Sequence, residues 1–158
     1  MENIYSNKVK RFSFDGVAPY LNSTGIFLTI LLWSYAVFSK LEDLKLYQRQ
    51  MNEQPFSPEI IYVLLYLVPA LELAAATLLI LNRYKWGLRI SLALLVCFTI
   101  YISLILNKVF LNAPCSCGGF ISKLSWKNHL YFNMLFIALN TFCLIHANKK
   151  ERRSTANS

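Results

Sequence analysis

Charged residues are scarce in this chain, and that scarcity argues against an ordinary soluble domain. They make up 15% of its 158 residues, whereas soluble domains carry about 25%. Hydrophobic residues reach 56% against roughly 45–50% in soluble domains, and the mean hydropathy is +0.41. Such a chain has too little polar surface to dissolve, so the composition predicts a membrane protein.

The chain also lacks a basic cluster on a polar face, which argues against nucleic-acid binding. Its net charge is +8, but a DNA or RNA footprint needs Lys and Arg gathered on one folded surface. Here the basic residues flank apolar runs, as membrane topology requires.

Four apolar runs predict an all-α, polytopic membrane protein with a four-transmembrane-helix bundle. Each approaches the roughly 20 residues that cross a bilayer core. The runs are residues 22–38 with continuation through Leu41, residues 60–81, residues 88–106 and residues 130–147. The predicted domains are a leader over 1–21, a membrane domain over 22–147 and a basic tail over 148–158, which we expect to be disordered from Arg152. No small-x-small cleavage site follows the first run, which favours a retained helix over a signal peptide.

The Lys and Arg residues divide unequally between the two sides of these spans. Six lie in the first and third loops, and ten flank the other ends of the spans: Lys8, Lys10, Arg11, Arg83, Lys85, Arg89, Lys149, Lys150, Arg152 and Arg153. The positive-inside rule then predicts that both termini are cytoplasmic. Trp86 and Trp126 would lie at opposite interfaces of the membrane. A bacterial inner membrane fits this topology best, with the third loop in the periplasm.

The third loop contains Cys115-Ser116-Cys117, which we predict to be the reactive site. The topology places this pair outside the cytoplasm, where disulfides persist. Two thiols separated by one residue close a small strained ring, and strained or exposed disulfides are the labile and catalytic ones. Pro114 fixes the backbone before the pair, and glycines follow it, so another protein could approach the sulfur atoms.

Groups near the fourth span would raise the thiolate fraction of this pair. They are the positive end of the helix dipole, Lys123, Lys127 and a protonated His129. A structural disulfide, or two idle thiols, remains an alternative. A metal site is not predicted, because zinc usually takes four ligands and His129 is the only other outer candidate.

Glu72 is the only acidic residue inside a predicted span, and an intramembrane charge is a functional-site candidate by default. Pro69 should bend the helix three residues earlier. The alternative is a protonated or paired glutamate that only packs the bundle. Lys40 would reach Glu72 if the first helix is long, but snorkelling of its ammonium to the interface is the favoured interpretation.

Helical spacing places His129, Asn133 and Asn140 on one face of the fourth span, which should point inward. Asn140 is expected to hydrogen-bond across helices, while His129 and Asn133 are candidates to line a site. Cys97 and Cys143 lie inside spans and are expected to be packing residues.

These elements together resemble the MauE branch of the MauE/DoxX family of small four-helix membrane proteins, over about residues 22–147. The matching segments are residues 38–43, Pro69 to Leu73, Cys115 to Gly119, and Ser125-Trp126 with Asn133. In methylamine-utilisation systems such a protein is linked to maturation of a disulfide-rich periplasmic dehydrogenase subunit, with a thioredoxin-like partner. DoxX-type members are linked to quinone-coupled sulfur oxidation, so the resemblance allows a quinone without requiring one.

The sequence therefore predicts a membrane component of a thiol-disulfide redox system. Through Cys115 and Cys117 it would exchange disulfides or electrons with a periplasmic thioredoxin-like or substrate protein. Lys40, Pro69, Glu72, Trp126, His129 and Asn133 are the supporting candidates. The alternative is a non-catalytic membrane anchor or assembly subunit for a periplasmic or lipoprotein partner. The direction of electron flow, enzymatic status and oligomeric state stay open.

Overall fold

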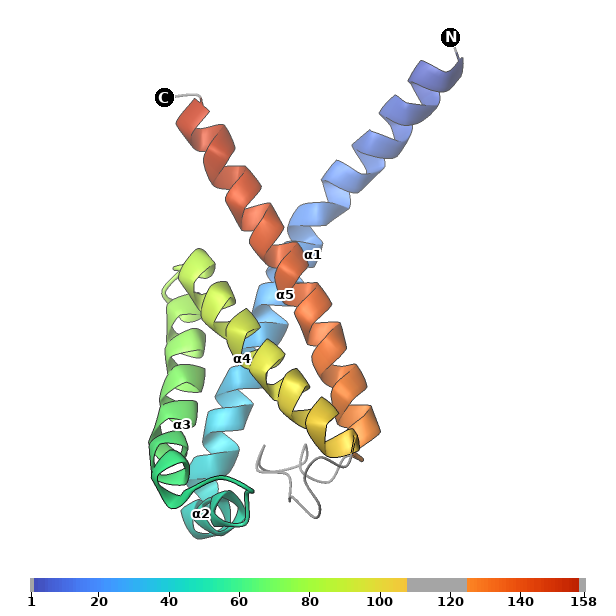
Figure 1. Ribbon diagram of the computed structural model, residues 1–158. Helices are drawn as coiled ribbons and strands as arrows, with labels where there is room; N and C mark the ends of the chain where they lie inside the picture. The colour runs from blue at the N-terminus through green and yellow to red at the C-terminus, as the bar shows by residue number, and fades with distance from the viewer. Residues whose placement is uncertain (1, 108–124, 157–158) are drawn as a thin grey trace.

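The computed structural model describes residues 2–107 and 125–156, and these residues form helices and short connections (Figure 1). The helices are α1 (Glu2–Glu42), α2 (Leu44–Asn52), α3 (Pro58–Ile80), α4 (Tyr84–Leu106) and α5 (Trp126–Ala156). No strand occurs among the described residues. The predicted all-α class is confirmed.

Four helices in the described part of the chain are long and apolar enough to cross a membrane. They are Ala18–Glu42 within α1, all of α3 and α4, and Lys127–Lys149 within α5. Their 23 to 25 residues exceed the roughly 20 needed for a span, and the first continues through Leu41 as expected. The chain is a multi-pass membrane protein.

The spans form a bundle in which α1 and α4 each pack against both α3 and α5. In Figure 1 the N-terminal end of α1 and the C-terminal end of α5 lie at the top, and α2 lies at the bottom. The end of α4 and the start of α5 are also at the lower end. The end of α4 and the start of α5 thus lie at the same end of the bundle as α2, opposite the two termini.

Helix α2 was not predicted, because the segment between the first two spans was assigned to a loop. The side chain of Asp43 caps this helix by accepting from the Leu46 amide at 2.9 Å. Tyr47 and Met51, one turn apart, are buried and pack with Ile61 of α3. This four-residue spacing of apolar side chains is the signal that would have revealed the helix.

Both terminal segments continue the adjoining spans as helix. Helix α1 begins at Glu2, so the leader is continuous with the first span. The expectation of disorder from Arg152 is wrong for the described residues, since α5 continues to Ala156. No glycine or proline occurs between Ala147 and Ala156 to end that helix.

The α3–α4 connection is a tight turn closed by the backbone. Asn82 has a φ of 58°, the left-handed conformation that commonly ends a helix. Its amide donates to the Leu79 carbonyl at 3.2 Å, and the Arg83 amide donates to Leu78 at 2.8 Å. This pair of bonds is the Schellman pattern, which satisfies carbonyls at the end of α3 and returns the chain as α4.

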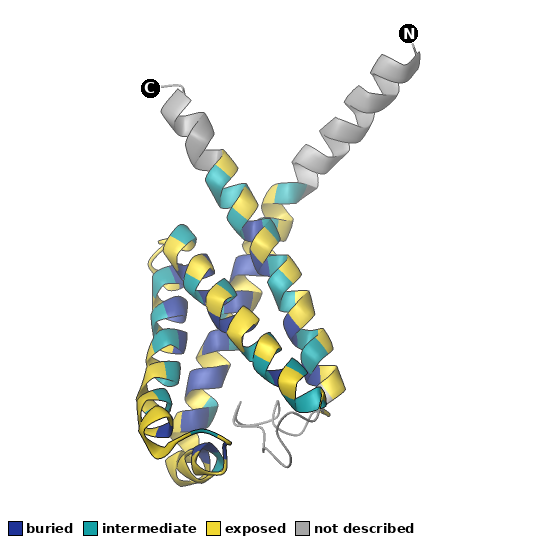
Figure 2. Cartoon of the chain, in the orientation of Figure 1, coloured by how far each residue is buried: buried dark blue, intermediate teal, exposed yellow. Residues whose placement is uncertain are grey.

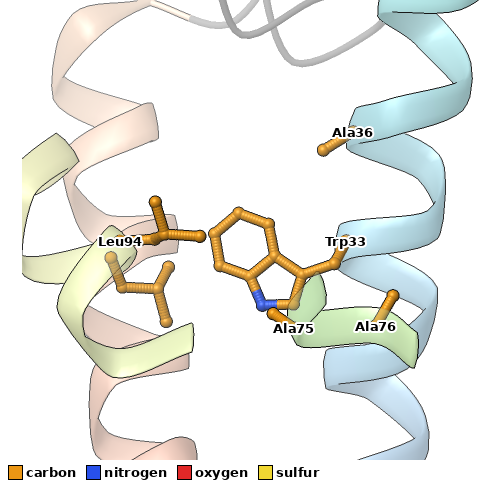
Figure 3. Close-up of a cluster of buried hydrophobic side chains, with 6 residues drawn as sticks. Trp33, Ala36, Ala75, Ala76 and Leu94 are labelled. Carbon is orange, nitrogen blue, oxygen red and sulfur yellow. The ribbon is translucent and has the colours of Figure 1, made fainter. Parts of the chain in front are cut away.

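The buried residues lie where the helices meet, whereas much of the outer surface is apolar and exposed (Figure 2). The main core cluster centres on Trp33 of α1, which meets Ala75 and Ala76 of α3 and Leu94 of α4 (Figure 3). The Trp33 indole donates to the Ser91 hydroxyl at 2.7 Å. Because lipid is as apolar as the core, small residues that permit close packing are what such helix interfaces need.

Gly25 permits a close approach between α1 and α5. A Cβ atom at Gly25 would lie 2.6 Å from the Cys143 Sγ and 3.0 Å from the nearest Leu139 atom. Cys143 is fully buried in a cluster with Ile26 and Leu88, so its predicted packing role is confirmed.

Candidate functional site

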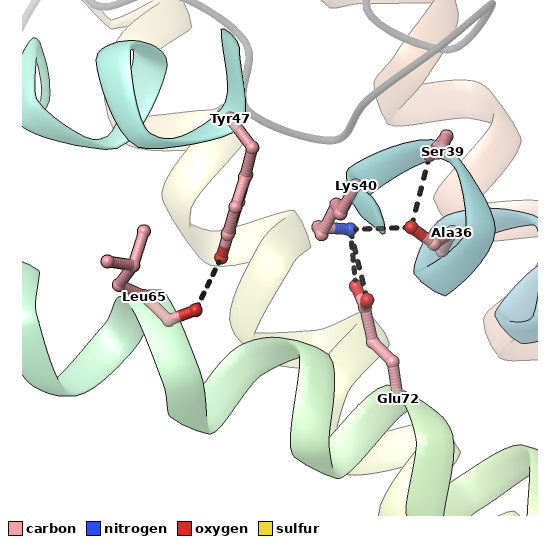
Figure 4. A network of polar contacts seen from close by, with 6 residues as sticks. All are labelled: Ala36, Ser39, Lys40, Tyr47, Leu65 and Glu72. Atoms are coloured by element: carbon pink, nitrogen blue, oxygen red, sulfur yellow. Dashed lines mark hydrogen bonds and ion pairs between the residues drawn. The ribbon is translucent and has the colours of Figure 1, made fainter. Parts of the chain in front are cut away.

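A buried ion pair between Lys40 of α1 and Glu72 of α3 is the main polar feature of the bundle (Figure 4). The Lys40 Nζ lies 2.9 Å from one carboxylate oxygen of Glu72 and 3.0 Å from the other. It also donates to the Ala36 carbonyl at 3.2 Å. The side chains are 3% and 1% exposed. Three acceptor atoms therefore face the three protons of the ammonium.

The expectation that Lys40 snorkels to the interface is wrong. Helix α1 is long enough to bring Lys40 beside Glu72, which was the condition for pairing. The carboxylate offers the ammonium charge-assisted bonds within the protein. An unpaired charge on Glu72 inside the membrane would cost free energy, and pairing with Lys40 lowers that cost for both side chains.

Helix α2 covers this ion pair through Tyr47. The Lys40 Nζ lies 5.9 Å from the centroid of the Tyr47 ring, within the range of a cation–π contact. The Tyr47 hydroxyl donates to the Leu65 carbonyl of α3 at 3.3 Å, as Figure 4 shows. Tyr47 thereby joins α2 to α3 directly beside the buried charges.

A small cavity of about 30 Å³ lies between all four spans, with Glu72 in its wall. We call it the central cavity. Its wall comprises Leu32, Trp33, Ala36, Glu72, Leu95, Phe98, His129, Phe132 and Asn133. His129 and Asn133 are each 3% exposed, and the Asn133 Nδ2 has no hydrogen-bond partner among the described residues. The structure thus brings His129 and Asn133 together with Glu72.

The inward polar face predicted for the fourth span is confirmed. His129, Asn133 and Asn140 are all buried on α5. The Asn140 Nδ2 donates to the Thr29 hydroxyl of α1 at 3.3 Å and to the Phe136 carbonyl at 2.9 Å. Asn140 therefore links two helices, as expected of an amide in a membrane bundle.

A larger cavity of about 370 Å³ lies between α2, α3 and α4, on the Lys40 side of the ion pair. We call it the large cavity. It is lined by Lys40, Tyr47, Met51, Gln54, Phe56, Leu64, Leu67, Val68, Leu71, Leu94, Cys97, Phe98, Tyr101 and Ile102. The Tyr101 hydroxyl donates to the Gln54 carbonyl oxygen in this wall. Cys97 is exposed, so the expectation that it is a packing residue is wrong.

The remaining predicted site residues are only partly covered by the structure. Cys115 and Cys117 lie outside the described residues, as does the side chain of Trp126, which opens α5. Pro69 lies inside α3, three residues before Glu72. Sequence reasoning missed Tyr47, whose place in the site follows from the unpredicted helix α2.

Two of three comparisons with known proteins gave no match, while the third identifies the family. No curated protein and no solved structure matches the chain significantly. The model of a family described as methylamine utilisation protein MauE matches residues 18–146, which include all four spans. This chain therefore belongs to the MauE family.

Proposed function

We propose that this MauE-family protein is the membrane component of a thiol-disulfide redox system, with Cys115 and Cys117 as its reactive pair. The observation that carries the proposal is the buried polar cluster of Lys40, Glu72, His129 and Asn133. Paired charges at intramembrane depth are expensive and mark functional sites. A bundle held together only by packing has no need of them.

The position of this cluster supports a link with the thiols. His129 lies in the first turn of α5, shortly after the segment that carries Cys115 and Cys117. The end of α4 and the start of α5 lie at the same end of the bundle as α2 (Figure 1). Helix α2 in turn contacts the ion pair through Tyr47. The polar cluster therefore lies near the end of the bundle where α4 ends and α5 begins.

The proposed exchange transfers two electrons between the dithiol of the partner and the Cys115–Cys117 disulfide. A thiolate of the partner attacks one sulfur of the Cys115–Cys117 disulfide, forms a mixed disulfide and displaces the other cysteine as a thiolate. The second partner thiol then attacks the mixed disulfide. The partner leaves oxidised, and Cys115 and Cys117 are left reduced with two electrons and two protons. The reverse sequence reduces the partner.

The partner and the orientation are part of this proposal. The division of Lys and Arg residues favours cytoplasmic termini and a periplasmic Cys115–Cys117 pair in a bacterial inner membrane. The partner would then be a periplasmic protein, either thioredoxin-like or itself the substrate. The description of the matching family, a methylamine utilisation protein, supports an association with that system.

The large cavity fits a quinone, should the reduced pair pass its electrons to one. Its volume of about 370 Å³ falls within the range of roughly 300–1,000 Å³ typical of small-molecule sites, and its wall is mostly apolar with a few polar groups. Lys40, Gln54 and Tyr101 are the polar side chains of this wall. A bound quinone would supply a two-electron acceptor.

Alkylation with a membrane-impermeant maleimide tests the proposal. The background variant carries Cys97→Ser and Cys143→Ala, so that only Cys115 and Cys117 can react. In spheroplasts, labelling that requires prior reductant is expected, and it should disappear when both remaining cysteines are replaced by serine. Labelling that is absent with and without reductant would contradict an outward, reversible disulfide.

The oxidation state of the partner protein separates redox function from anchoring. In cells carrying Cys115→Ser and Cys117→Ser, the partner should remain bound but accumulate in the wrong thiol state. A partner with its normal oxidation state in these cells would favour the anchor or assembly subunit instead.

A further inference from the structure

We propose that the central cavity binds one water molecule, held by Asn133 and Glu72 beside His129, and that this water joins α3 to α5 across the bundle. The site is distinct from the thiol pair and is formed entirely by described residues. It does not depend on the proposed redox function.

The small size of the cavity favours water over larger ligands. Its volume is about 30 Å³, and one water needs roughly 10–15 Å³, so the cavity has room for one or two water molecules. Trp33 forms part of this wall and is held in place by its bond to Ser91.

The chemistry of the wall selects a ligand that both accepts and donates hydrogen bonds. The Asn133 Nδ2 is a buried donor without a partner among the described residues. Each carboxylate oxygen of Glu72 takes one bond from Lys40, and each retains further acceptor capacity. Water accepts from the amide and donates to the carboxylate. Engineered cavities that stay dry are apolar, and polar ones hold water.

The position of the cavity gives this water a connecting role. Helices α3 and α5 each pack against α1 and α4 and do not pack extensively against each other. Glu72 of α3 and the pair His129 and Asn133 of α5 meet at the cavity wall. A water there would complete a polar connection from Lys40 through Glu72 to the first turns of α5.

Such a water would also exchange protons with the titratable groups of the wall, Glu72 and His129. The other charged group beside it is Lys40, whose ammonium is bound to Glu72. Disulfide exchange requires an acceptor for thiol protons, so the connection would serve the Cys115–Cys117 pair; this last step alone rests on the proposed function.

Nuclear magnetic resonance of the full chain in lipid nanodiscs tests the water site, with asparagine labelled by ¹⁵N. Asn140 is the internal control for the amide protons, because its equally buried Nδ2 donates to Thr29 and Phe136, and only its Oδ1 has no partner among the described residues. A cross-peak between water and the Asn133 side-chain amide is expected, with none for Asn140. No cross-peak for Asn133, or equal cross-peaks for both amides, would overturn the proposal.

Two alanine-to-valine substitutions test where the water lies. Ala36 lines the central cavity, whereas Ala75 is buried in the same core cluster but does not line it. Ala36→Val should abolish the Asn133 cross-peak by filling the cavity, and Ala75→Val should leave it. Equal loss in both variants would place the water elsewhere. Neither result depends on thiol chemistry, so failure of the water site and failure of the redox proposal are distinguishable.

Discussion

Replacement of Glu72 by leucine leaves the Lys40 ammonium buried without its charge partner. Two of the three acceptors within reach of the Nζ belong to Glu72, at 2.9 and 3.0 Å, and only the Ala36 carbonyl remains. Removing one partner of a buried pair typically costs about 3–5 kcal/mol. We expect the free energy of unfolding to fall by this amount in Glu72→Leu, and by a similar amount in Lys40→Met.

The double variant Lys40→Met/Glu72→Leu should recover most of that loss. Replacing a buried ion pair by apolar side chains of similar volume is often neutral or stabilising, because it removes the desolvation cost of both charges. Its stability should therefore lie within about 1 kcal/mol of wild type or above it, far from the sum of the single losses.

The exposed pair of Arg49 and Glu53 provides the matched control. These side chains bond at 3.2 Å but are 79% and 49% exposed, so replacing either one should cost less than about 1 kcal/mol. Reversible unfolding in mixed micelles, followed by circular dichroism, measures all of these variants. The reasoning would be refuted if Glu72→Leu cost no more than the control, or if the losses at Lys40 and Glu72 were additive.

Three further predictions concern packing, backbone and access. Gly25→Ala should lower the free energy of unfolding by about 1–3 kcal/mol through overpacking against the Cys143 Sγ. Adding Cys143→Ala should relieve part of that loss in the same unfolding assay. Unchanged stability of Gly25→Ala would refute the close contact. Asn82→Gly should be tolerated at a φ of 58°, whereas Asn82→Val should lower the melting temperature, and equal melting temperatures would contradict the turn geometry. A membrane-permeant maleimide should label exposed Cys97 much faster than buried Cys143, and decylubiquinone should slow the Cys97 reaction if it occupies the large cavity; equal rates with and without it would count against a quinone there.

The spans and their inward faces could be predicted from sequence because both follow from periodicity and length. Four runs of sufficient apolar length specify four helices, and offsets of four and seven residues place His129, Asn133 and Asn140 on one face. The structure agrees on both points. These properties depend only on neighbours along one helix.

From the sequence, the Lys40–Glu72 ion pair could be named as an alternative but not preferred over snorkelling, because the pair depends on contacts between helices. Lys40 and Glu72 are 32 residues apart, and their meeting requires α1 to run far enough beside α3. Snorkelling needs no such partner, so it was the natural expectation for a lysine near a helix end. The prediction that Cys97 is a packing residue was wrong for the same reason. Cys97 lines the large cavity between α2, α3 and α4, and the sequence of one helix does not reveal such a cavity.

The stability of the double variant also bears on why the bundle contains charges at all. If methionine and leucine can replace Lys40 and Glu72 without loss of stability, packing and folding do not require the pair. The pair must then have a functional role at its position between two cavities. Lys40 lines the large cavity and Glu72 lines the central cavity. A stable double variant that no longer sets the thiol state of the proposed partner would assign that role to the proposed redox cycle. A stable double variant that still does so would confine the proposed chemistry to Cys115 and Cys117.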